Sequence, residues 1–164
     1  MDISSIYPDD SGNVFDSMVE GMDSIFLIKT SNVHKLADQL AVYHSLTGRV
    51  AYHWHDNSGI KRFDLQHITI PKTQRLIDAI YHIGNTQHFG IFLFSGFTDQ
   101  LQSPMIANVM KHFLESTKQQ RKYLIFADPH PMIPKELAEH FQELTIESTE
   151  SGKEPAVRTS YLYS

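Results

Sequence analysis

The sequence predicts a three-layer α/β sandwich built on a mostly parallel sheet of five strands. Three observations predict this class. Short continuous apolar runs recur along the chain, and each is typical of a strand buried on both faces. Amphipathic segments with helical spacing separate these runs, and the loops between them are short. The length of 164 residues suits one domain, since domains typically run to roughly 100–150 residues.

Five apolar runs predict the strands of this sheet. They cover residues 24–28, 50–54, 90–94, 123–127 and 144–146. The turn at residues 57–59 indicates that residues 60–65 return as a short hairpin arm after the second strand.

Cap residues, prolines and glycines predict the helices between the strands. Thr30, Ser31 or Asn32 can cap the first of them, and Gly48 ends it. Proline favours the first helical position, so helices are expected to begin at Pro71, at Pro104 and at Pro134. We expect the apolar stripes of the two central helices to face inward: Leu76, Ile77, Ile80, Tyr81 and Ile83 in one, and Met105, Ile106, Val109, Met110, Phe113 and Leu114 in the other.

The chain divides into three parts by composition. Residues 1–22 read as a lead-in segment, in which Val14, Phe15, Met18 and Val19 predict a short amphipathic helix. Residues 23–147 form the α/β domain. Residues 148–164 are a polar tail, although alternation over residues 156–163 can add an edge strand.

Charge and composition exclude several classes of function. Fourteen basic against 19 acidic side chains argue against binding to nucleic acid or to an anionic membrane, because both need clustered Lys and Arg. The absence of cysteine excludes disulfides and thiolate chemistry. The first 20 residues do not resemble a signal peptide, and the longest apolar run covers only residues 91–94. We therefore expect a cytoplasmic protein.

The carboxyl ends of parallel strands are where α/β sheets bind ligands. The first strand leads into residues 29–32, which contain no glycine and so form no competent nucleotide loop. This sequence favours a polar loop with a helix cap, but it leaves open a residual phosphate site at Lys29 and Ser31. Ser95 ends the third strand and cannot replace the Mg²⁺-binding carboxylate of a nucleotide hydrolase. Asp128 ends the fourth and is either a ligand-binding carboxylate or a turn residue.

Ten histidines raise the question of a metal site. His53 and His55 lie two apart on a strand, so both project to one face, as a metal site requires. Their other interpretation is a polar strand end that needs no metal. Ser95 is also the one candidate nucleophile, with His130 as its base, although a small residue at a strand end explains it equally well.

Four stretches resemble a known family. Residues 52–59 carry a Trp and a Gly-containing arm, residues 91–97 a strand ending in Phe-x-x-Phe, residues 122–126 a further strand, and residues 133–137 an Ile-Pro-x-Glu-Leu segment. Together, residues 21–147 resemble the N-terminal, P-loop-lacking domain that precedes the active module in AAA ATPases of the hypothetical chloroplast reading frame type.

The resemblance implies a P-loop-NTPase-like sheet that does not hydrolyse nucleotide and serves as an interaction or regulatory part. No catalytic residue carries over from it. The chain departs from the family pattern at Ser95, where the strand often ends in an acidic residue. Its 164 residues contain no ATPase module after this domain, which leaves open a free-standing protein or an excised domain.

We therefore expect a catalytically inert domain that needs no cofactor and binds a protein partner, with self-association left open. Trp54, His55 and Phe97 are expected to form an exposed interaction surface, because an exposed aromatic is a natural anchor. One alternative is a small metal-dependent hydrolase that uses His53, His55 and Asp128. Another is non-hydrolytic binding of a nucleotide or phosphorylated ligand at the first strand end.

Overall fold

One sheet of seven strands forms the middle layer of the protein, in the spatial order β3-β2-β4-β5-β1-β6-β7. The computed structural model describes residues 11–116, 121–147 and 156–158. Its strands are β1 (Ile25–Lys29), β2 (Ala51–His55), β3 (Gly59–Arg62), β4 (Gly90–Ser95), β5 (Lys122–Asp128), β6 (Gln142–Glu147) and β7 (Ala156–Arg158). Its helices are α1 (Ser11–Glu20), α2 (Val33–Thr47), α3 (Leu76–Asn85), α4 (Thr98–Leu101), α5 (Ile106–Ser116) and the 3₁₀ turn η2 (Ala138–His140).

The five strands in the centre of the sheet are parallel, and the two outer strands are antiparallel. β2, β4, β5, β1 and β6 pair in parallel, whereas β3 pairs antiparallel to β2 and β7 antiparallel to β6. The predicted α/β class and its five parallel strands are confirmed. β3 corresponds to the predicted hairpin arm and β7 to the edge strand that the tail can add, while the rest of residues 148–164 lies outside the described part of the chain.

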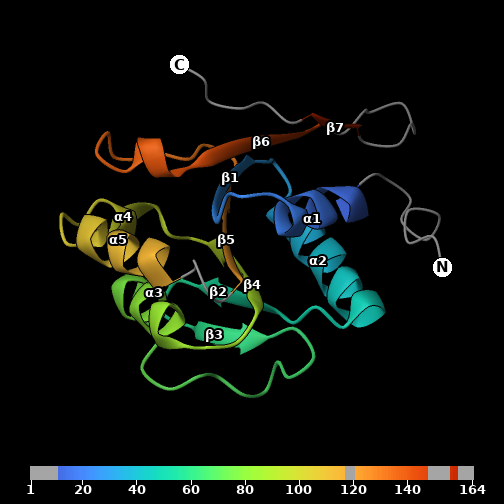
Figure 1. Ribbon diagram of the computed structural model, residues 1–164, viewed down its shortest axis with the longest axis horizontal. Helices are drawn as coiled ribbons and strands as arrows, with labels where there is room; N and C mark the ends of the chain where they lie inside the picture. The colour runs from blue at the N-terminus through green and yellow to red at the C-terminus, as the bar shows by residue number, and fades with distance from the viewer. Residues whose placement is uncertain (1–10, 117–120, 148–155, 159–164) are drawn as a thin grey trace.

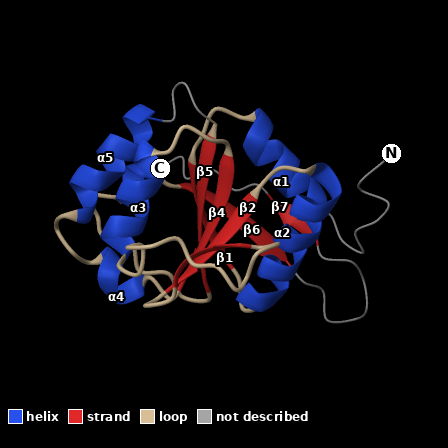
Figure 2. Cartoon of the chain, turned by 90° about the horizontal axis from the view of Figure 1, so that it is seen from below, coloured by secondary structure: helices blue, strands red, loops and turns tan. Residues whose placement is uncertain are grey.

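Helices cover both faces of the sheet, with α1 and α2 on one and α3, α4 and α5 on the other (Figure 1, Figure 2). Side chains alternate along the strands, so β1, β2, β4 and β5 each contribute to two cores. Leu27, Trp54, Phe94 and Phe126 face α3 and α5, whereas Ile28, Ala51, Leu93 and Ile125 face α1 and α2. Burial on both faces explains why the strands are continuous apolar runs.

Local sequence fixes the ends of α2. The Asn32 side chain accepts a hydrogen bond from the Lys35 backbone N–H at 3.0 Å, which caps the first turn. Gly48 adopts a left-handed conformation with φ of +73° and donates its backbone N–H to the His44 carbonyl oxygen. Of the three predicted cap residues, Asn32 therefore carries out the role.

Two helix starts predicted from proline were wrong. Residues 71–75 form turns, and α3 begins at Leu76. Thr73 is fully buried. Its hydroxyl accepts a hydrogen bond from Ile60 N–H at 2.9 Å and donates one to the Ile70 carbonyl oxygen at 2.7 Å, so its polar group is satisfied. Residues 63–75, here named the covering loop, are thereby held along β3. Likewise, the segment after Pro134 is a turn that leads to η2.

Candidate functional site

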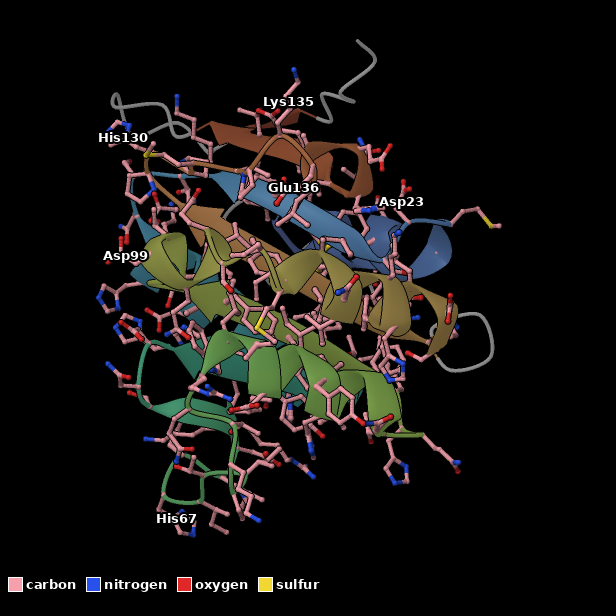
Figure 3. The ribbon with its side chains drawn as sticks, turned by 90° about the vertical axis from the view of Figure 1, so that its left-hand side faces the viewer. Asp23, His67, Asp99, His130, Lys135 and Glu136 are labelled. Carbon is pink, nitrogen blue, oxygen red and sulfur yellow. The ribbon has the colours of Figure 1, made fainter. Side chains whose placement is uncertain are left out.

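The carboxyl ends of the parallel strands were the predicted location of a site, and the structure places the predicted residues there in two separate groups. Lys29 and Asp128 are partners in the register of β1 and β5. Ser95 ends β4 and is the register partner of His55 on β2. His130 and Asp99 project from this edge of the molecule, while Asp23 lies at the opposite edge (Figure 3).

His53, His55 and Ser95 form one hydrogen-bonded cluster on the α2 side of the sheet. His53 Nε2 lies 2.9 Å and His55 Nδ1 lies 3.0 Å from Ser95 Oγ. A serine hydroxyl donates one hydrogen bond and accepts two, so it can satisfy both rings when one of them accepts from it. Ser95 is buried, with 7% of its surface exposed. The sequence predicted the shared face of the two histidines, but not their common partner.

The pKa of His53 is lowered to about 4, mainly by burial and to a smaller extent by the nearby His55 and His34. His53 is therefore neutral near pH 7. His55 is exposed at the rim of the cluster, and its ring packs against Gly96. A Cβ atom at Gly96 would lie 2.8 Å from His55 Cε1, and Gly96 also has a φ of +66°, so this turn requires glycine.

The predicted metal-binding and hydrolase groups do not assemble. β4 lies between β2 and β5, and side-chain alternation directs Asp128 to the face opposite Ser95. Within the described residues, no three His, Asp or Glu side chains are arranged to hold a metal ion. Ser95 contacts His53 and His55, whereas His130 donates its backbone N–H to Asp128 Oδ2 at 2.8 Å. His130 as the base for Ser95 was therefore wrong, and Asp128 accepts a hydrogen bond within its own turn.

The predicted phosphate residues are exposed, but they do not converge with Ser95. Lys29 and Ser31 lie at the surface beside the start of α2. Lys29 projects to the α3 and α5 face of the sheet and Ser95 to the α2 face, because each takes its side from the alternation of its strand. Of the four predicted ligand-binding residues, only Lys29 and Asp128 are neighbours with a shared face.

The prediction that Trp54 and Phe97 are exposed was wrong. They are 1% and 0% exposed, respectively, and both belong to the core on the α3 and α5 side. Trp54 Nε1–H donates to the Thr73 carbonyl oxygen at 2.7 Å, and the Phe97 ring meets the Phe126 ring edge-on at 5.1 Å. The covering loop and α4 bury these residues, and neither element was predicted to do so. Of that predicted surface, only His55 is exposed.

A further link at this edge was missed by sequence reasoning. The Gln100 side chain on α4 accepts from the Leu76 backbone N–H at 2.7 Å and donates to Asp56 Oδ1. It thus joins the β2–β3 turn to the first residue of α3. No pattern in the sequence marks Gln100, since a lone glutamine after a strand has many partners open to it.

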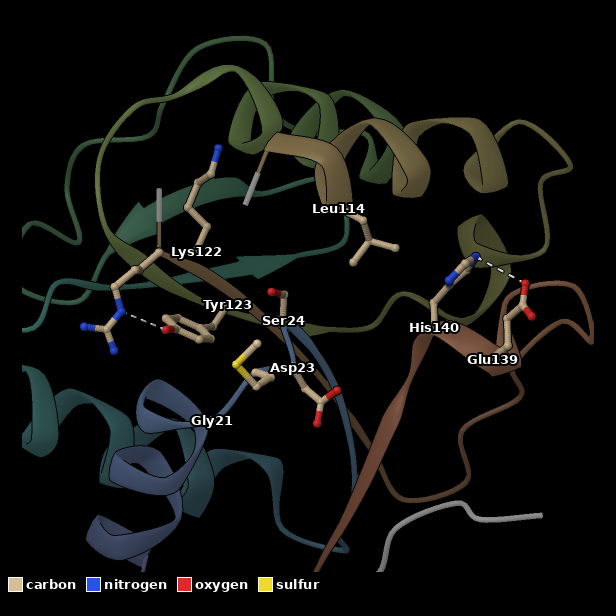
Figure 4. A pocket seen from close by; sticks show the side chains of 10 residues that line it. Gly21, Asp23, Ser24, Leu114, Lys122, Tyr123, Glu139 and His140 are labelled. Carbon is tan, nitrogen blue, oxygen red and sulfur yellow. Dashed lines mark hydrogen bonds and ion pairs between the residues drawn. The ribbon is translucent and has the colours of Figure 1, made fainter. Parts of the chain in front are cut away.

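A hollow of about 630 Å³ lies at the amino ends of β1 and β5 rather than at the predicted edge (Figure 4). Asp23 and Ser24 line it beside Leu114 and His140. Arg121 Nε–H donates to the Tyr123 hydroxyl at 3.2 Å, and Tyr123 donates to the Val19 carbonyl oxygen at 2.9 Å. These groups therefore hold the end of α1 on the sheet.

Apolar patches at the surface lie elsewhere. Tyr81 on α3 is 55% exposed and Met105, immediately before α5, is 64% exposed, so the prediction that both face inward was wrong.

Among the described residues, no helix has the length and apolar character needed to cross a membrane.

Of the comparisons with known proteins, one identifies a family. No curated protein and no solved structure was found to match the chain. A family model described as "SpoVK-like AAA ATPase, N-terminal domain" matches residues 13–146, which include every strand from β1 to β5 and most of β6. Because this match spans most of the sequence, the chain belongs to the family of SpoVK-like AAA ATPase N-terminal domains.

Proposed function

We propose that this domain is a non-catalytic interaction and regulatory domain that acts through contacts with protein. The observation that carries the proposal is the chemistry at the carboxyl edge of the sheet. There four of the polar side chains bond to one another or within their own turn: His53 and His55 to Ser95, and Asp128 to the His130 backbone. They hold local structure together at the edge where an enzyme of this class would direct groups at a substrate.

The loop between β1 and α2 supports the same proposal. Residues 29–32 contain no glycine, and Asn32 uses its side chain to cap α2. A phosphate-binding loop instead uses glycine so that backbone N–H groups can approach the phosphates closely. We therefore propose a sheet related to P-loop NTPases without their nucleotide chemistry. The finer relation, to AAA ATPases of the hypothetical chloroplast reading frame type, rests on residues 52–59 and 91–97 and is part of this proposal.

A nucleotide titration tests the non-catalytic part. We expect the melting temperature of the protein to stay unchanged when Mg-ATP or Mg-ADP is added, because a ligand that binds only the folded state raises it. A saturable rise contradicts the proposal. If Lys29→Ala then removed that rise while Lys135→Ala did not, the result would instead establish nucleotide binding at the first strand end.

A binding experiment tests the regulatory part. The purified domain is titrated into an ATPase module from a SpoVK-like protein, and both the binding heat and the rate of ATP hydrolysis are measured. We expect saturable binding and a changed rate. Absence of both would contradict a regulatory role toward such a module.

A further inference from the structure

We draw no further inference here: the strongest candidate, the apolar groove between α3 and α5 that Ile77, Tyr81, Met105 and Val109 line, carries none because nothing in the structure shows what covers it.

Discussion

The indole Nε1–H of Trp54 donates a hydrogen bond to the backbone carbonyl oxygen of Thr73 at 2.7 Å, and both residues are buried. The bond joins β2 to the covering loop across β3. Because Thr73 also bonds through its hydroxyl to Ile60, one buried pair fixes the hairpin and the loop together.

Replacing this tryptophan tests the bond directly. Trp54→Phe removes the donor and part of a buried ring, and we expect the free energy of unfolding to fall by about 2–4 kcal/mol. Trp54 is the sole tryptophan of the chain, so circular dichroism rather than fluorescence must follow the denaturation. Tyr81→Phe, at an exposed position, should change stability by less than about 0.5 kcal/mol. Equal stability of the Trp54 variant and the wild type would contradict the role of the bond.

Lys122 is a buried lysine that holds the end of α3. Its Nζ donates to the carbonyl oxygens of Ile83 and Thr86, each at 2.9 Å, and to Ser116 Oγ at 3.1 Å. Lys122→Met removes the buried ammonium donor that these acceptors share, so we expect a loss of about 2–4 kcal/mol in the free energy of unfolding. Lys111→Met on the exposed face of α5 is the matched control. Similar urea midpoints for the two variants would contradict this account.

The lowered pKa of His53 predicts how the free energy of unfolding depends on pH. Its pKa is lowered from 6.5 to about 4 in the folded protein, mainly by burial. Between these two values the unfolded chain binds more protons at this site, so stability falls as the pH drops through this window and is unaffected by His53 above it. We expect His53→Gln to reduce the loss between pH 7 and pH 4 by about 1–3 kcal/mol, as measured by denaturation at both pH values. His67→Gln, at an exposed position, should keep the wild-type slope. A His53 variant with that same slope would refute the prediction.

Gly48 and Gly59 have similar positive φ angles but different surroundings, so their replacement distinguishes backbone strain from steric crowding. Gly48 has a φ of +73° and no atom near the position of an added Cβ, whereas Gly59, at +79°, would place one 2.8 Å from Thr69 Cγ2 and 2.9 Å from Thr73 Oγ1. Gly48→Ala should cost about 1–2 kcal/mol of unfolding free energy through backbone strain alone. We expect Gly59→Ala to cost more, because the covering loop must also move. Equal losses in thermal denaturation would show that the loop adapts freely.

Sequence alone predicts the central sheet because its strands are buried on both faces. A short apolar run between two amphipathic helices, such as residues 91–94, is typical of a strand of a parallel sheet covered on both faces. Period-two alternation also placed His53 and His55 on one face. It could not place Ser95 beside them, because the register between β2 and β4 depends on residues 40 positions apart.

The wrong predictions concern residues whose burial or exposure depends on contacts with residues far away in the sequence. The covering loop was predicted only as the end of a hairpin arm and the start of a helix at Pro71, yet it buries Trp54 through Thr73. Tyr81 and Met105 fit the apolar stripes of their helices, but these stripes are wider than the face that the sheet covers. The excess apolar width indicates an exposed apolar patch, and only the packed structure shows that Tyr81 and Met105 form it.

The covering loop has a consequence for how the molecule can associate with others. An uncovered edge strand has unpaired backbone N–H and C=O groups, which can pair with any extended peptide and lead to edge-to-edge aggregation. At β3, Ile60 donates its outward N–H to Thr73 Oγ1 and accepts from the Ile70 N–H at 2.9 Å, so both of its outward backbone groups are occupied. A strand of another chain would have to displace the covering loop to pair with Ile60. Association at this side of the molecule therefore depends on side-chain contacts rather than on backbone pairing.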